Sequence, residues 1–322
     1  MKTITLFYPI REALECVERK MHQAVQTEHE RLTEVLEYLV HSGGKRIRPA
    51  LVILSSRFHP ADEDGVIALA AAVEMLHTAT LIHDDLIDES FLRRGLPTLN
   101  SHWSPGATIL TGDYLFSCAA SLAAETQNVR VMSIFSRTLA IICGGELHQL
   151  FSGRDKLPTV DDYYRRISSK TASLFAASAE AGAVLSNAPE DQVRALRDYG
   201  HNLGTAFQII DDVLDFVGDE GKTGKPIGSD LRQGIATLPT LYFLYKGNGP
   251  DVVTQVLDGT LRDELSASAA IDAIRASGAI DATIAEASHF SRRGQEALEA
   301  LPDNLYRRIL FDLSDFAVER NR

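Results

Sequence analysis

The chain has 322 residues, of which 45% are hydrophobic, and this supply of apolar side chains is ample for a buried core and excludes intrinsic disorder. Its 32 basic and 44 acidic residues give a net charge of −12, which argues against a general nucleic-acid-binding protein and favours a soluble cytoplasmic one. Its 3 cysteines are scattered and show no zinc-site or Cys-x-x-Cys spacing, so they predict neither a disulfide framework nor a zinc site.

The first residues of the chain lack the long apolar region of a secretory signal. The longest apolar stretch, residues 66–73, is far shorter than a membrane span. We therefore expect no transmembrane segment and a cytoplasmic location.

Helical periodicity dominates the chain. The first clear repeat consists of Leu32, Val35, Leu36, Leu39 and Val40. This helix is expected to end at the glycine pair Gly43-Gly44. The same period recurs over residues 131–142, before Gly144-Gly145, and over residues 306–317 near the C-terminus.

The composition of the remaining segments also favours helices. Alanine-rich stretches at residues 68–72 and 172–183 permit close helix packing, whereas the alternation of a β-strand is nearly absent. Glycine and proline breakers separate the helices, but none of these segments is long or polar enough for an interdomain linker. We predict an all-α fold with a single domain over residues 1–322.

Two acidic runs of the same shape interrupt this apolar helical sequence. They are Asp84-Asp85-Leu86-Ile87-Asp88 and Asp211-Asp212-Val213-Leu214-Asp215. On a helix the first and last carboxylates of each run lie about 6 Å apart, where they repel each other by about 2–3 kcal/mol at an effective dielectric of about 20. Such oxygen ligands favour hard divalent cations, and Mg²⁺ when the other ligands are phosphates. A solvated acidic face is the alternative for either run taken alone.

Basic residues precede or follow these runs. Residues Lys45, Arg46 and Arg48 come just after the glycine pair, where backbone N–H groups can approach a phosphate. Arg93 and Arg94 follow the first acidic run and suit bidentate phosphate binding. A solvated loop in the first case and simple charge compensation in the second are the alternatives.

Several motifs then occur in a fixed order along the chain. They are Gly43-Gly44-Lys45-Arg46-x-Arg48-Pro49, Leu81-Ile82-His83-Asp84-Asp85-x-x-Asp88, Arg93-Arg94-Gly95, Ser169-Lys170-Thr171, Phe207-Gln208-x-x-Asp211-Asp212-x-x-Asp215, Gly224-Lys225-Pro226 and Thr237-Leu238-Pro239. In order and spacing they resemble the signatures of the trans-type (all-E) polyprenyl diphosphate synthases. In the residues that make up each motif they resemble the medium- and long-chain branch of that family. The resemblance implies a helical bundle around a central cavity, the isoprenoid synthase fold.

The resemblance also implies a reaction, the head-to-tail condensation of an allylic diphosphate with isopentenyl diphosphate. By resemblance, Asp84, Asp88 and Asp211 hold Mg²⁺, three ions per active site, which neutralise the departing diphosphate. Asp85 and Asp212, together with Asp215, are expected to support the metal shell.

Further positions of the resemblance concern the two substrates. Arg93, Lys170 and Lys225 match positions for the allylic diphosphate. The positions for isopentenyl diphosphate are matched by Lys45, Arg48, His77 and Arg94. Thr171 and Gln208 match positions beside the allylic cation, where neutral dipoles stabilise charge; with Lys170 they are the expected catalytic residues.

Small residues before the first acidic run favour a long product. In the family, bulky aromatic residues at the positions of Ala79 and Thr80 block the tunnel of short-product enzymes. Deeper along this helix, Leu76 is expected to narrow a groove whose facing side offers the alanines at 119, 120, 123 and 124. We predict a product longer than C20, between C30 and C45, with helix packing as the alternative role of these alanines.

Other functions fit the sequence less well. A geranylgeranyl or other short-chain diphosphate synthase would share the motifs, and a non-catalytic partner subunit would usually lack some of the aspartates that are all present here. A terpene cyclase has no use for Lys45, Arg48 and Arg94, and an EF-hand would place oxygen ligands and glycine differently. The resemblance further implies a homodimer, with the apolar faces of the first helices as one possible interface.

Overall fold

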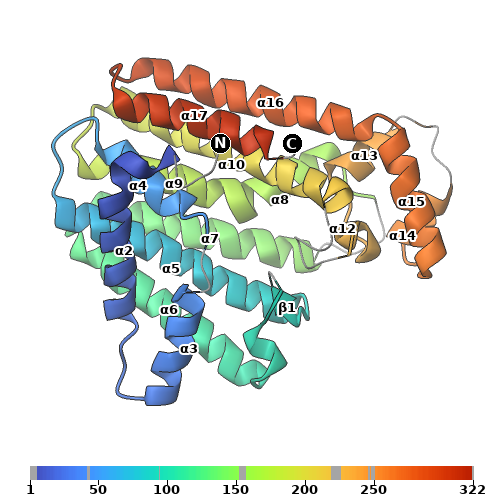
Figure 1. The fold of residues 1–322 in the computed structure, drawn as a ribbon, viewed down its shortest axis with the longest axis horizontal. Coiled ribbons are helices and arrows are strands. Elements are labelled where there is room, and N and C mark those ends of the chain that lie inside the picture. Colours follow the sequence, from blue (N-terminus) through green and yellow to red (C-terminus); the bar gives the residue numbers. More distant parts are fainter. Residues whose placement is uncertain are drawn as a thin grey trace. The chain divides into compact units, whose positions relative to one another are not determined.

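The computed structural model describes residues 6–41, 44–93, 95–151, 157–218, 226–245, 247 and 251–320. Helices dominate these residues (Figure 1), which confirms the predicted all-α class. The strands in the described ranges are β1 (Leu92–Arg93) and β2 (Leu96–Pro97), a short antiparallel hairpin in which Leu92 lies opposite Pro97. Gly95 has a φ of 76° in its turn, which explains the glycine at this breaker.

The chain divides into two compact units, each described by itself. Unit 1 comprises Met1–Leu139, Leu174–Gly200 and Ala297–Leu313, and unit 2 comprises Ala140–Ser173, His201–Glu296 and Ser314–Arg322. Three helices divide their length between the two units: α7 (Val129–Phe151), α10 (Glu190–Val217) and α17 (Leu305–Glu319). Two more, α9 (Ser173–Leu185) and α16 (Ala279–Ala297), have a single terminal residue in the other unit. A single domain over residues 1–322 stays a prediction.

Most of the remaining helices belong wholly to one unit. Unit 1 contains η1 (Tyr8–Ile10), α2 (Arg11–Ala24), α3 (Glu30–His41), α4 (Ile47–Ser56), α5 (Glu63–Ile87), η2 (Leu99–Ser101), α6 (Pro105–Glu125), nearly all of α9 (Ser173–Leu185) and η4 (Leu298–Ala300). Unit 2 contains α8 (Val160–Ile167), the π-helical turn η3 (Ser168–Ala172), α12 (Ser229–Arg232), α13 (Leu238–Tyr245), α14 (Asp251–Leu257), α15 (Glu264–Ala276) and nearly all of α16 (Ala279–Ala297).

Helix α5 is the centre of unit 1. The side chain of Asp62 accepts a hydrogen bond from the backbone N–H of Gly65 and caps the start of the helix. The residues that follow are buried on every face of the helix, because α5 packs against α2, α4 and α6. Helix α6 runs beside it (Figure 1). The helix ends at the first acidic run, where the N–H of Asp88 donates to the carbonyl of Asp84 over 2.8 Å.

Two helices of the described ranges, α5 and α6, are long and apolar enough to cross a membrane by length and composition alone. In α5, 72% of the apolar window is buried, which is typical of a core helix of a folded domain. In α6 the buried share is 44%. The cytoplasmic location and the absence of a transmembrane segment therefore stay predictions.

The first helices use their apolar faces inside unit 1. Val17 and Met21 of α2 and Leu36 and Val40 of α3 are at most 1% exposed. These faces therefore belong to the core of the unit rather than to a free surface. The expected glycine end of α3 lies outside the described residues, since 42 and 43 are not described.

Small residues let α4 and α9 approach closely. A Cβ atom on Gly182 of α9 would lie 2.4 Å from the carbonyl oxygen of Val52 in α4. The alanines that surround Gly182 in α9 are buried, as the alanine-rich sequence predicts.

The glycine pair of α7 does not end this helix. It continues through Gly144 and Gly145 to Phe151, beyond residue 142, where its apolar repeat stops.

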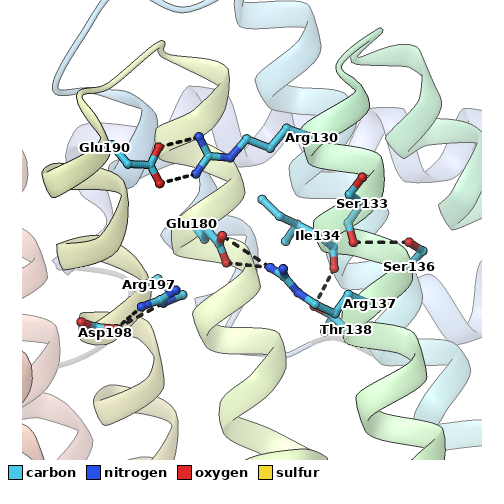
Figure 2. Close-up of polar contacts among 10 residues, drawn as sticks. All are labelled: Arg130, Ser133, Ile134, Ser136, Arg137, Thr138, Glu180, Glu190, Arg197 and Asp198. Atoms are coloured by element: carbon cyan, nitrogen blue, oxygen red, sulfur yellow. Dashed lines mark hydrogen bonds and ion pairs between the residues drawn. The ribbon is translucent and has the colours of Figure 1, made fainter.

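Ion pairs link α7 to its neighbours in unit 1 (Figure 2). Arg130 donates to both carboxylate oxygens of Glu190 over 2.7 Å, and Arg137 approaches Glu180 at 3.4–3.5 Å. The Arg130 and Glu190 side chains are about half exposed, so solvent screens their attraction. These pairs join the helices without dominating their stability.

The contact at Gly182 leads to a stability prediction. Gly182→Ala is expected to destabilise the protein by about 1–3 kcal/mol, because the added methyl group would press on the backbone of α4. Urea unfolding at fixed pH measures this change.

The control is Gly144→Ala, at a helical glycine with no atom within 4 Å of an added Cβ. This substitution should stabilise the helix by about 0.5–1 kcal/mol. Equal effects of the two substitutions would contradict the close packing of α4 and α9.

Candidate active site

The first acidic run closes α5 in unit 1 and binds the hairpin that follows it. Asp85 is buried, and its carboxylate accepts bonds from Arg93 Nε at 2.8 and 2.9 Å and from Arg93 Nη2 at 2.8 Å. Asn100 also donates to the Asp85 carbonyl over 3.0 Å. Asp85 therefore holds Arg93 beside the run, while Asp88 is exposed and Asp84 half-buried.

The other predicted residues of unit 1 lie on α5 and at the start of α4. Lys45 is exposed, and the Arg48 guanidinium lies 4.7 Å from the centre of the Phe175 ring of α9, a cation–π contact. His77 is half-buried on α5, two turns before Asp84, and its carbonyl accepts a 2.7 Å hydrogen bond from Thr80 Oγ1.

The second acidic run lies near the end of α10 in unit 2, and each aspartate has different surroundings. Asp211 Oδ1 accepts a 3.0 Å bond from Arg320 Nη1, yet the Asp211 side chain remains 40% exposed. Asp215 accepts from the backbone N–H groups of Ser229 and Asp230, both at 3.1 Å, at the start of α12. Asp215 therefore anchors the start of α12.

Asp212 is buried in a hydrogen-bond network. It accepts bonds from the Tyr163 hydroxyl at 2.7 Å and from Gln208 Nε2 at 2.9 Å, and Thr171 Oγ1 donates to Gln208 Oε1 over 2.7 Å. Burial raises the pKa of Asp212 to about 7, with a contribution from Asp230, although the bonds from Tyr163 and Gln208 favour its charged form. The network thus joins two of the expected catalytic residues, Thr171 and Gln208, through the aspartate next to Asp211.

Lys170 lies in the π-helical turn η3, a kind of turn that often marks functional sites. Its Nζ lies 3.1 Å from Glu146 Oε1 of α7, and its side chain is 37% exposed. Gly145 makes room for this turn, because a Cβ there would lie 2.5 Å from the Cβ of Ser169. Glu146 therefore holds the lysine in place without burying it.

The predicted residues fall into two groups, one in each unit. Unit 1 contains Lys45, Arg48, His77, Asp84, Asp85, Asp88 and Arg93, and unit 2 contains Lys170, Thr171, Gln208, Asp211, Asp212 and Asp215. Arg94 and Lys225 lie outside the described residues. Within the part of the chain that the structure describes, no three or more His, Cys, Asp or Glu side chains cluster as a metal site.

Three residues that contact the predicted site residues were not identified from the sequence. Glu146 pairs with Lys170, Tyr163 donates to Asp212, and Arg320 pairs with Asp211. Arg320 is 6% exposed, and it also donates to the Phe207 carbonyl over 2.9 Å and lies 3.6 Å from the centre of the Phe207 ring. A lone tyrosine in α8 and an arginine after the last helix carry no spacing signal, so neither contact was predictable.

Residues expected to set product length lie on the buried part of α5. Ala79 is fully buried, and Leu76 lines a cavity of about 10 Å³. The cavity is lined by Leu69, Val73, Leu76, Val131, Ile134, Phe135, Thr138, Leu174, Ala177 and Ala181. It therefore faces α7 and α9 rather than the expected alanines of α6, of which Ala124 is exposed.

The fold, with acidic runs late in two long helices and cations beside them, is that of an all-α isoprenoid synthase. A family model described as polyprenyl synthetase matches residues 29–274. The chain is 39% identical over 324 residues to heptaprenyl diphosphate synthase component 2 of Geobacillus stearothermophilus, covering 100% of both. It is 36% identical over 288 residues to octaprenyl diphosphate synthase of Escherichia coli, covering 88% of each.

Solved structures agree. A polyprenyl synthase from Caulobacter crescentus, complexed with calcium and isoprenyl diphosphate, is 36% identical with a TM-score of 0.94, covering 100% of this chain and 98% of that one. A decaprenyl diphosphate synthase from Rhodobacter capsulatus is 37% identical with a TM-score of 0.91, covering 100% of both. The chain belongs to the polyprenyl synthetase family and is a prenyltransferase of the trans-polyprenyl diphosphate synthase type, which confirms the resemblance read from its motifs.

The raised pKa of Asp212 makes stability depend on pH. The folded protein retains a proton on Asp212 up to about pH 7, whereas the ordinary pKa is 3.8. The stability that this proton provides is complete below the ordinary value and is lost as the pH rises through about 7. Asp212→Asn carries no such proton. Its free energy of unfolding, measured with urea in EDTA, should therefore depend much less on pH between 3.8 and about 7 than that of the wild type.

The exposed Asp161→Asn in α8 serves as the control and should retain the wild-type pH dependence. A wild-type slope in Asp212→Asn would show that Asp212 does not bind a proton in this range.

Proposed function

We propose that this chain condenses an allylic diphosphate with isopentenyl diphosphate to give an all-trans polyprenyl diphosphate. The observation that carries the proposal is that each acidic run has a positioned cation in its own unit: Arg93 is held by Asp85, and Lys170 is held by Glu146. Both cations remain at least one third exposed, so each is accessible to a diphosphate.

Asp84, Asp88 and Asp211 would hold divalent metal. Their carboxylates are hard oxygen donors that are not deeply buried, and Asp211 also pairs with Arg320. Asp85 and Asp212, in contrast, are buried. Relatives from Caulobacter crescentus and Corynebacterium glutamicum were crystallised with calcium and isoprenyl diphosphate, which supports the use of a divalent metal. We propose Mg²⁺, three ions per active site, which when bound neutralises the departing diphosphate.

The protein groups then act around the reacting carbons. Arg93, Lys170 and Lys225 bind the allylic diphosphate, whose C–O bond breaks with the electron pair on the leaving oxygen. Lys45, Arg48, His77 and Arg94 hold isopentenyl diphosphate, whose double bond attacks the allylic cation. The lost proton passes to the released diphosphate, so no protein base is required.

Thr171 and Gln208 would stabilise the allylic cation. Their hydrogen bond aligns the two dipoles, and Gln208 is itself fixed by Asp212. A group held in this way stabilises charge without reorganisation, and a neutral hydroxyl or amide at this place does not trap the cation as readily as an ionised nucleophile would.

A product longer than C20, between C30 and C45, is part of the proposal. The heptaprenyl, octaprenyl and decaprenyl synthases among the relatives support it, as does the small side chain of Ala79. A geranylgeranyl product is the alternative, since a synthase of that kind from Pyrococcus horikoshii is 33% identical with a TM-score of 0.88.

We further propose a homodimer that acts in the cytoplasm. Exposed apolar side chains in the first turns of α6, Ile109 and Leu110, support an interface in unit 1. A different subunit is the alternative, because the relative from Geobacillus stearothermophilus is named as component 2 of its synthase.

The proposal is tested with the purified chain alone, Mg²⁺, labelled isopentenyl diphosphate and separate C5, C10, C15 and C20 allylic primers. We expect products longer than C20. Asp84→Asn and Asp211→Asn should each lower kcat by about 10²–10³-fold, because each removes a metal ligand.

Asp64→Asn is the matched control, an exposed aspartate in the first turn of α5, and should retain activity. Products that stop at C15 or C20 with every primer would contradict the chain length. Activity that requires a second protein would support the partner-subunit alternative.

Product length should respond to the side chain at position 79. Ala79→Tyr is expected to shorten the products, because a phenol ring at this buried position would block the groove before the cavity at Leu76. Product sizing by reversed-phase chromatography after dephosphorylation measures the change. Ala124→Tyr, at an exposed position of α6, should leave the length unaltered, and unchanged products in Ala79→Tyr would place the tunnel elsewhere.

A further inference from the structure

The middle cation of the Lys45-Arg46-Ile47-Arg48 segment differs from its neighbours. Arg46 is only 15% exposed in its side chain. Its Nη1 donates to Glu74 Oε1 over 2.9 Å and its Nη2 donates to the Val40 carbonyl over 2.9 Å. Its Nε lies 3.4 Å from Glu18 Oε1, so one guanidinium joins α2, α3 and α5.

The partner of Arg46 is an unusual residue for its place. Glu74 lies among the apolar residues of α5, between the buried Val73 and Met75, and its side chain is 6% exposed. A carboxylate in such surroundings is stable as an anion only when a cation or hydrogen-bond donors compensate it. Arg46 supplies both a positive charge and hydrogen-bond donors, so the ion pair explains why both charged side chains can be buried.

The pair holds a backbone conformation that arginine rarely adopts. Arg46 has φ 49° and ψ 32°, in the left-handed region, at the residue that precedes α4. Its carbonyl accepts the N–H of Ala50 over 3.1 Å and starts the helix. Since this one residue sets the direction of the chain between Lys45 and Arg48, its conformation determines where these two cations point.

Glu74 also lies on the side of α5 that carries a predicted substrate residue. Glu74 and His77 are three residues apart, and residues at this spacing share a face of a helix. The ion pair therefore fixes the left-handed turn relative to the stretch of α5 that contains His77.

We propose that Arg46 and Glu74 are positioning residues for isopentenyl diphosphate. Their buried ion pair maintains the left-handed turn that presents Lys45 and Arg48 and keeps this turn in place against α5. The inference rests on the proposed function, in which Lys45, Arg48 and His77 bind that substrate.

The test compares the Michaelis constants of the two substrates in Glu74→Gln and Arg46→Gly. Glu74→Gln keeps the shape of the side chain and removes its charge. Arg46→Gly removes the guanidinium but readily adopts a positive φ. Both variants should raise KM for isopentenyl diphosphate about tenfold and leave KM for the allylic diphosphate within about twofold. The reason is that only the isopentenyl diphosphate site depends on the left-handed turn.

The control is Glu63→Gln, which removes the exposed partner of Arg57 at the other end of α5 and should leave both constants unchanged. A wild-type KM for isopentenyl diphosphate in Glu74→Gln, or a parallel rise of both constants, would overturn the inference. A wild-type KM in Arg46→Gly alone would show that only the backbone conformation matters and would overturn the role of the ion pair.

Thermal unfolding of each variant identifies misfolded protein. If Glu74→Gln does not fold, Arg46→Lys replaces it, since lysine keeps the charge but cannot donate to Glu74 and Val40 with the same fork. The selective rise of KM is then expected in Arg46→Lys, and its absence overturns the inference. If the wild-type chain consumes no isopentenyl diphosphate, the proposed function fails instead.

Discussion

The rest of the structure depends on how crowded carboxylates are accommodated at the ends of α5 and α10. Three aspartates within one helical turn repel one another, and the protein reduces this repulsion by engaging some of them internally. Asp85 binds Arg93, Asp212 is buried with Tyr163 and Gln208, and Asp215 accepts backbone N–H groups. Asp84, Asp88 and Asp211 remain more accessible than Asp85 and Asp212, as metal-dependent diphosphate chemistry requires.

The same internal contacts fix the cations. Because Asp85 and Glu146 are bound to Arg93 and Lys170, these two side chains are oriented before any substrate arrives. Preorganised charges lose little entropy on binding and stabilise a departing anion at once. Under the proposed function, the first acidic run would therefore act on the diphosphate in two ways, through the metal that Asp84 and Asp88 would hold and through Arg93, which Asp85 positions.

Local sequence predicted the helices and the close packing of the alanine-rich α9, because each depends on residues near one another in the chain. The contacts of the site were not predictable in this way. Tyr163 and Asp212 are 49 residues apart, and Arg320 and Asp211 are 109 apart. The hairpin at Leu92–Pro97 and the side of α5 that faces the cavity likewise depend on tertiary packing, which a periodic pattern does not encode.

The arginine after the last helix has a practical consequence for anyone who produces this protein. Its guanidinium donates to the Phe207 and Ala317 carbonyls and to the Asp211 carboxylate, so residue 320 is fastened to the second acidic run. Extra residues fused after Arg320 would begin next to the guanidinium that holds Asp211, a predicted metal ligand. Purification handles are better attached at the opposite terminus, where the first described residues precede α2 and carry no group of the proposed chemistry.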